Sequence, residues 1–254
     1  MDAKVMKKAS VKPAKLPYGY SLPQLSPMYM QPPFEYRDAW SMMVPFKSDP
    51  RAIAHLLPKP LVPDPQGAMF VTTSRFFTAG FGHYNETLIG AIAKYRGRTV
   101  NHALYLILDN DIAIAAGREI WGFPKKLGRV SLSDRDGVIS AAVERGGQSL
   151  IRAAMEVGPL VSASELAGSA EYTNLKLVPS VREGGAPEVM QLTSTTLTNV
   201  VIKQVYKGRA TLSFGASPVD RFSDIPVREV LAAYYYNADF TLGHGEVLHD
   251  YLKA

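Results

Sequence analysis

The sequence contains no cysteine. A chain without cysteine has no disulfide framework, no thiolate nucleophile and no zinc or iron–sulfur site built on sulfur ligands. Any catalytic chemistry must therefore use other side chains. The composition, with 46% hydrophobic and 20% charged residues, is close to the average of globular proteins and excludes a disordered or low-complexity chain.

Long apolar runs are also missing. The longest candidates, residues 104–108 and 112–116, are separated by Asp109, Asn110 and Asp111, and each is far shorter than the roughly 20 residues of a membrane helix. The first lysines of the chain are not followed by the apolar segment of a secretory signal. We therefore expect a cytoplasmic protein with no membrane partner.

Several familiar functional motifs are absent. The chain has no G-x-S-x-G, no Walker A loop and no G-x-G-x-x-G after a predicted strand, which excludes the hydrolase, P-loop and Rossmann classes that depend on them. The five histidines do not have metal-ligand spacing: His55, His83, His102, His244 and His249. We therefore expect neither a metal nor a cofactor.

The positive charge is concentrated near the N-terminus. The chain has 28 basic and 23 acidic residues and a formal net charge of +5, but five lysines and one aspartate fall within residues 1–15. Six of the 18 prolines lie within residues 1–33, which predicts an extended arm without helix or central strand. Because the remaining chain is nearly neutral, we expect a solvated arm or one draped on a neighbouring subunit, and no nucleic-acid partner.

Residues 34–254 are predicted to form one β-rich domain. Short runs rich in β-branched and aromatic residues alternate with turn signals, and no repeat or linker divides them. Asp136-Gly137 and Gly146-Gly147 predict tight turns that join three strands over residues 129–157. The predicted strands are 40–46, 69–77, 87–95, 100–108, 129–133, 138–145, 149–157, 175–179, 188–194, 197–205, 210–214 and 233–242.

Three segments predict short helices. Asp49-Pro50 is a cap and first-position proline for residues 51–57, and Asp224-Ile225-Pro226 has the same form before residues 227–232. The third helix spans about residues 112–121, begins at Asn110 or Asp111, and stops before Gly122-Phe123-Pro124.

Two adjacent lysines, Lys125 and Lys126, follow this stop. Trp121, Phe123 and Leu127 bracket them, whereas a solvated turn has no need of such apolar neighbours. An amine attacks a ketone only when it is unprotonated, and a lysine with the ordinary pKa of about 10.4 is almost entirely ammonium at neutral pH. Burial among apolar side chains lowers the pKa of an amine, so this segment predicts a nucleophilic lysine. Since consecutive side chains of an extended segment diverge, burial is expected to matter more than the neighbouring charge.

The segment G-R-E-x-x-G-F-P-K-K-L-G at residues 117–128 resembles the signature of the acetoacetate decarboxylase family. The resemblance extends from about Phe34 to the C-terminus. Further landmarks lie in the family order at residues 34–38, 57–61, 80–86, 106–110, 224–230 and 245–253. This resemblance implies a closed antiparallel β barrel with the lysine inside, a small keto acid as substrate and assembly as a homo-oligomer.

The resemblance also implies roles for four residues. Lys125 forms a Schiff base with the substrate, and Lys126 is the neighbouring cation that helps to lower its pKa; the family is itself the standard example of this effect. Arg37 matches an arginine that orients the substrate carboxylate, and Glu86 matches a glutamate that transfers protons. The implied reaction is decarboxylation of a β-keto acid such as acetoacetate through an imine.

Two departures leave alternatives open. The decarboxylases carry a second glutamate fifteen residues before the matched one, and Val71 occupies that position. Thr87-Leu88-Ile89 also replaces the small polar run that follows the family glutamate. A Schiff-base aldolase–dehydratase or hydratase acting on pyruvate and other 2-oxo acids is therefore a second hypothesis. The third is a non-catalytic β barrel that binds small apolar acids.

Overall fold

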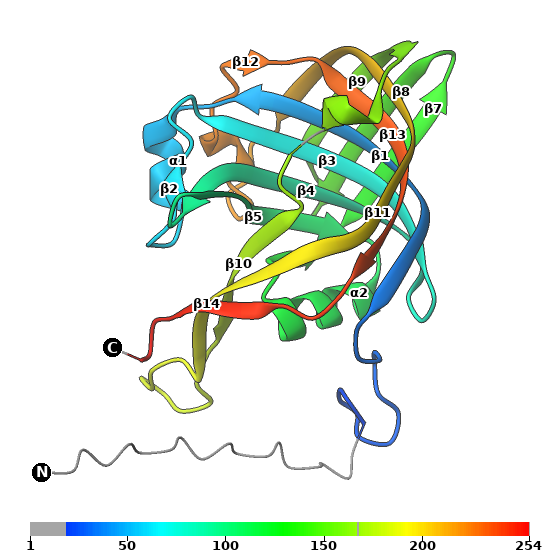
Figure 1. The fold of residues 1–254 in the computed structure, drawn as a ribbon. Coiled ribbons are helices and arrows are strands. Elements are labelled where there is room, and N and C mark those ends of the chain that lie inside the picture. Colours follow the sequence, from blue (N-terminus) through cyan, green and yellow to red (C-terminus); the bar gives the residue numbers. More distant parts are fainter. Residues whose placement is uncertain (1–18, 167, 254) are drawn as a thin grey trace, which may run out of the picture.

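The structure is a computed structural model that describes residues 19–166 and 168–253. Within these residues, fourteen strands belong to one hydrogen-bonded sheet, and the helices are short (Figure 1). The predicted β-rich fold is therefore confirmed. The basic part of the predicted arm, residues 1–15, lies outside the described residues.

The elements follow one another along the chain with these bounds. The strands are β1 (Phe34–Lys47), β2 (Val62–Pro63), β3 (Ala68–Thr78), β4 (Gly82–Tyr95), β5 (Arg98–Leu108), β6 (Lys125–Leu127), β7 (Arg129–Arg135), β8 (Val138–Arg145), β9 (Gln148–Leu160), β10 (Glu171–Val178), β11 (Val189–Phe214), β12 (Glu229–Val230), β13 (Ala233–Leu242) and β14 (Glu246–Asp250). The helices are α1 (Pro50–Leu56), α2 (Asp111–Ala116), the π-helix η1 (Gly117–Trp121) and the 3₁₀ turns η2 (Ala163–Leu166) and η3 (Phe222–Asp224).

Seven strands form a closed path. β5, β4, β3, β1, β13 and β11 pair in that order, and β10 pairs with both β11 and β5. The pairs are antiparallel except for β10 with β5 and β5 with β6, which are parallel. The expected barrel is therefore not antiparallel throughout, because β10 and β6 each run in the same direction as β5.

The predicted meander over residues 129–157 is confirmed. β7, β8 and β9 pair antiparallel and continue outward from β11. Asp136 and Gly137 have φ values of 52° and 76°, and Gly146 and Gly147 have 58° and 76°. These positive angles are those that a two-residue hairpin turn requires.

All twelve predicted strand segments overlap observed strands. Residues 188–194, 197–205 and 210–214 belong to the single long strand β11. The strands β2, β6, β12 and β14 were not predicted. Each has five residues or fewer, which is too short for an alternating pattern to be visible.

Two of the three predicted helices are confirmed. In α1, the Asp49 side chain accepts a hydrogen bond from the Arg51 N–H, with Pro50 in the first turn. In α2, Asn110 caps the helix by accepting from the Ala113 N–H, and η1 continues it to Trp121. Gly122 then ends it with a φ of 80°, which favours glycine.

Residues 227–232 do not form the predicted helix, so that prediction is wrong. Ile225 is extended, as a residue before proline prefers, and only the 3₁₀ turn η3 precedes it. The N–H groups of Arg228 and Leu231 donate to the carbonyl oxygens of Lys47 and Pro45 on β1. Pairing with β1 therefore replaces the helical hydrogen bonds that the cap signature predicted.

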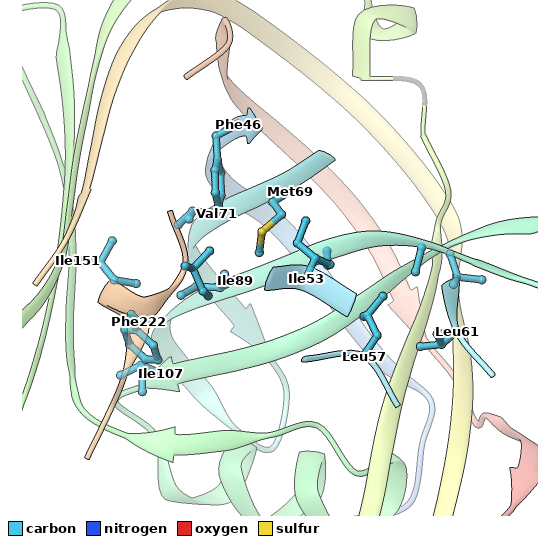
Figure 2. Packing of buried hydrophobic residues seen from close by; sticks show 14 of the residues in the cluster. Phe46, Ile53, Leu57, Leu61, Met69, Val71, Ile89, Ile107, Ile151 and Phe222 are labelled. Carbon is cyan, nitrogen blue, oxygen red and sulfur yellow. The ribbon is translucent and has the colours of Figure 1, made fainter. Parts of the chain in front are cut away.

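Two cores lie on opposite faces of β4 and β5. The aliphatic core contains Phe46, Ile53, Leu57, Leu61, Met69, Val71, Ile89, Ile107, Ile151 and Phe222 (Figure 2). The aromatic core contains Tyr29, Phe34, Tyr36, Phe81, Tyr84, Leu106, Leu108, Trp121 and Phe123. Because side chains alternate along a strand, β5 contributes Leu106 and Leu108 to one core and Ile107 to the other.

The N-terminal segment is attached to the aromatic core. Residues 19–33 contain bends and turns but no helix or strand. Tyr29 is buried, and its hydroxyl donates to the Glu119 carboxylate on η1. Among the described residues, no helix has both the length and the apolar character needed to span a membrane.

Candidate active site

The two adjacent lysines occupy the short strand β6. Lys125 lies opposite Leu106 of β5, and Lys126 lies opposite Ile107. Since neighbouring residues of a strand point to opposite faces, Lys125 faces the aromatic core and Lys126 faces the aliphatic core. The divergence expected from the sequence is therefore present.

Hydrogen bonds hold the backbone at the start of β6. The Phe123 N–H donates to the Gly117 carbonyl at 3.0 Å, and the Lys125 N–H donates to the Phe123 carbonyl at 2.7 Å. The Arg118 guanidinium donates to the Lys125 carbonyl at 3.1 Å. Arg118 therefore braces the turn that presents the lysine.

The Lys125 side chain is buried against the π-helix. It is 8% exposed, and its Nζ lies 5.7 Å from the centre of the Phe123 ring. A Cβ added to Gly117 would lie 2.6 Å from both Cδ and Cε of Lys125, closer than real contacts allow. The glycine therefore leaves the space that the lysine stem occupies.

Glu86 is the charged partner of Lys125. Its Oε2 lies 2.8 Å from Lys125 Nζ, and its side chain is 13% exposed. Glu86 comes from β4, opposite Leu108 of β5 and Ser74 of β3. Because Leu108 shares a face with Leu106, the pairing brings the carboxylate to the same core as the lysine.

Tyr36 and Tyr84 belong to the aromatic core that Glu86 faces, and Tyr172 packs against that core. Burial raises the pKa of Tyr36, Tyr84 and Tyr172 above the ordinary value, and the negative charge of Glu86 raises each further. Their hydroxyls are therefore neutral at physiological pH. They supply hydrogen-bonding groups to this region without adding charge.

Lys126 has a different partner on the opposite face. Its Nζ lies 2.6 Å from Oδ1 of Asp220, whose side chain is 4% exposed, and the Arg145 Nε lies 3.7 Å from Oδ2. The Asp220 N–H donates a hydrogen bond to the Ser217 hydroxyl oxygen. The charge of Lys126 is therefore compensated by a carboxylate that does not contact Lys125.

Arg37 and Val71 are not part of the contact between Lys125 and Glu86. Arg37 forms an ion pair at 2.8 Å with Glu35, and the side chains are 49% and 63% exposed. Val71 is buried in the aliphatic core, opposite Ile89. Of the four site residues predicted from the sequence, the structure thus brings Lys125 and Glu86 into contact, while Lys126 and Arg37 each pair elsewhere.

Asp220, Tyr36 and Tyr84 were not predicted from the sequence as site residues. Tyr84 has a local signal, because it precedes Glu86 by two residues and shares its face of β4. Asp220 is 94 residues from Lys126, so no local sequence signal links the two. Among the described residues, no group of three or more histidine, aspartate and glutamate side chains could hold a metal ion.

The arrangement can perform amine chemistry. A buried primary amine is held beside a carboxylate at hydrogen-bond distance, among aromatic rings and neutral phenols. The carboxylate can accept the proton that an amine must lose before it attacks a carbonyl carbon. Schiff-base formation requires an amine and a proton acceptor of this kind.

Comparison with known proteins identifies the family of the chain. The family model for acetoacetate decarboxylase matches residues 16–252. Acetoacetate decarboxylase 1 of Bradyrhizobium diazoefficiens is 30% identical over 238 residues, covering 92% of this chain and 94% of the relative. Acetoacetate decarboxylase of Burkholderia multivorans is 29% identical over 238 residues, covering 92% and 95%.

Solved structures share the fold. Acetoacetate decarboxylase from Legionella pneumophila subsp. pneumophila str. Philadelphia 1 has a TM-score of 0.86 and 26% identity, covering 92% of this chain and 94% of that one. The enduracididine biosynthesis enzyme MppR, complexed with the condensation product of pyruvate and imidazole 4-carboxaldehyde, has a TM-score of 0.83 and 21% identity, covering 92% and 98%. The second likeness concerns the fold alone. With a family model that matches nearly the whole chain, this protein belongs to the acetoacetate decarboxylase family.

Proposed function

We propose that this protein is a Schiff-base-forming lyase that decarboxylates a β-keto acid, acetoacetate or a close analogue, through an imine on Lys125. The observation that carries the proposal is the buried contact of Lys125 Nζ with Glu86 Oε2 at 2.8 Å. Membership of the acetoacetate decarboxylase family supports the choice of substrate class.

The reaction begins with proton transfer. Lys125 gives one proton to Glu86, and the neutral amine attacks the ketone carbon. The ketone oxygen takes one proton from the attacking nitrogen and one from Glu86, and it leaves as water. A protonated imine remains on Lys125, and Glu86 is again a carboxylate.

The imine then serves as the electron sink. The bond between the α-carbon and the carboxylate breaks, carbon dioxide leaves, and the electron pair forms an enamine with the former imine carbon. Protonation of the α-carbon restores the imine, and water releases the methyl ketone. Glu86 is the nearest carboxylate to carry these protons, since its oxygen lies at the amine.

Lys126 and Arg37 have less direct geometric support. We propose that Lys126 acts on Lys125 only through its charge, which Asp220 largely compensates at 2.6 Å. Arg37 would bind the substrate carboxylate only after exchanging its partner Glu35. The Arg37–Glu35 pair is exposed, and surface ion pairs contribute only about 0–1 kcal/mol to stability, so breaking it requires little free energy.

An aldolase–dehydratase or hydratase acting on pyruvate is the second candidate. The observation behind it is a sequence departure: Val71 stands where decarboxylases carry a glutamate, and its side chain lies in the aliphatic core, on the other face of the sheet from the Lys125–Glu86 contact. The complex of MppR with a pyruvate condensation product gives the same fold a precedent for that chemistry. Both candidates use the imine on Lys125, and they differ in whether carbon dioxide is released.

Borohydride reduction of the intact protein with acetoacetate, and separately with pyruvate, tests the proposal. We expect an irreversible mass increase with acetoacetate and continuous release of carbon dioxide without reductant. An adduct without gas release would favour the pyruvate reaction. The absence of an adduct with either ketone would overturn both enzymatic functions and leave the ligand-binding hypothesis.

A further inference from the structure

Two buried phenols form a pair beside Glu86. The hydroxyl oxygens of Tyr36 and Tyr84 lie 3.1 Å apart, and the two residues are 3% and 5% exposed. They come from β1 and β4, 48 residues apart in the chain. Tyr84 lies two residues before Glu86, so both side chains point to the same face of β4.

Aromatic rings fix the position of this pair. The Tyr36 ring stacks on Phe240 at 4.6 Å and meets the edge of Phe76 at 5.2 Å. The Tyr84 ring meets Phe76 at 5.5 Å. Such contacts restrict ring rotation, so the hydroxyls are held ready for a reacting group.

The pair has a hydrogen that no described residue accepts. Two phenols carry two hydroxyl hydrogens, and the bond between Tyr36 and Tyr84 uses one of them. Among the described residues, neither hydroxyl has another side-chain or backbone partner at hydrogen-bond distance. A buried donor without an acceptor is unfavourable, and an acceptor supplied by the substrate would remove that penalty.

Both phenols remain donors over the pH range in which the enzyme would work. Burial raises the pKa of each hydroxyl, and the Glu86 charge adds to the effect. A neutral donor stabilises an oxygen that gains negative charge, and its effect is large where water is excluded.

We infer that the Tyr36–Tyr84 pair is the oxygen-binding element of the lysine site. This inference rests on the proposed function. When Lys125 attacks the ketone, the carbonyl π electrons move onto oxygen, and the free hydroxyl hydrogen of the pair bonds that oxygen. The protons that convert it to water come from the Lys125 nitrogen and from Glu86, so both tyrosines stay protonated throughout.

Tyrosine-to-phenylalanine variants test the assignment. In Tyr36→Phe and Tyr84→Phe, we expect imine formation on Lys125 to slow by about 10- to 100-fold, because one donor to the oxygen is lost or displaced. The measurement is the single-turnover rate at which acetoacetate becomes trappable by borohydride. KM should change less than kcat, since the bond strengthens as charge develops on the oxygen.

Tyr95→Phe is the matched control. Tyr95 is also buried, and its hydroxyl donates to the Leu248 carbonyl at 2.8 Å in the aliphatic core. Its loss should reduce thermal stability to a similar extent without slowing imine formation. Wild-type imine rates in both Tyr36→Phe and Tyr84→Phe would overturn the inference, and so would an equal slowing in Tyr95→Phe. Failure of the wild-type protein to form any imine would instead overturn the proposed function.

Discussion

Lys125 and Lys126 are chemically identical neighbours with opposite surroundings. The Lys125 side chain is 8% exposed among aromatic side chains, and its amine contacts Glu86. The Lys126 side chain is 35% exposed and contacts Asp220 on the far side of the same three-residue strand. The alternation of side chains along β6 is sufficient to separate them.

In the proposed function, this difference separates the nucleophilic lysine from one that has a structural role. Lys125 contacts Glu86, which would accept its proton, and faces the core that contains the Tyr36–Tyr84 pair. Lys126 attaches β6 to the segment that carries Asp220, and Arg145 of β8 approaches the same carboxylate. Substitutions on the two faces should therefore change different properties of the protein.

The largest effect is expected at the reacting amine. Lys125→Met keeps the length of the side chain but removes the nucleophile, so decarboxylation should fall by about a thousandfold or more. Lys126→Met should reduce kcat/KM by about tenfold or less, because Asp220 already compensates that charge. Steady-state release of carbon dioxide measures the activity of both variants. Equal losses of activity in the two variants would show that Lys125 and Lys126 do not have different roles.

A smaller loss is expected at the carboxylate. Glu86→Gln keeps the shape of the side chain but cannot accept the lysine proton, so imine formation should slow by about 100-fold. Glu171→Gln is the control, since Glu171 is similarly buried at 16% exposure but pairs with Arg98. Rapid-quench trapping with borohydride gives the rate. An unchanged rate in Glu86→Gln would remove Glu86 from the mechanism.

Crowding the lysine stem should have the next largest effect. Gly117→Ala introduces a Cβ 2.6 Å from Cδ and Cε of Lys125, which must move the amine away from Glu86. We expect activity to fall by about 10-fold or more, since small displacements of reacting groups are costly. Gly243→Ala is the control, because its Cβ would meet no atom within 4 Å. Equal activity in both variants would contradict a tightly fitted lysine.

The smallest effect on activity is expected at the partner of Lys126. Asp220→Asn leaves Lys126 and Arg145 without a counter-charge, so the free energy of unfolding should fall by about 1–3 kcal/mol. Activity should change by less than about threefold. Urea denaturation measures the free energy of unfolding. Asp224→Asn breaks an exposed pair with Arg221 on the same segment and should change stability by less than about 1 kcal/mol.

The sequence predicted the local parts of this site and missed its long-range parts. The turn after η1, the two lysines and their divergence follow from glycine, proline and strand alternation within residues 117–128. The Asp220 contact spans 94 residues and the Tyr36–Tyr84 contact spans 48, so no local pattern records either.

The same distinction explains the mistaken helix after Asp224. Its cap signature is a local preference, whereas pairing with β1 depends on the folded arrangement of distant segments. The meander over residues 129–157 was predicted correctly because its turns and strands are adjacent in the chain. For Arg37, the family pattern identified a position, and its exposed pair with Glu35 could not be read from that pattern.

Residue-level mapping of the reduced acetoacetate adduct tests the central claim most directly. Borohydride-treated protein would be digested with an endoprotease that does not cleave at lysine, and the peptide containing residues 125 and 126 would be fragmented in a mass spectrometer. The two faces of β6 predict that the added mass lies on Lys125 and that Lys126 is unmodified. An adduct on Lys126, or one spread over surface lysines, would contradict the account.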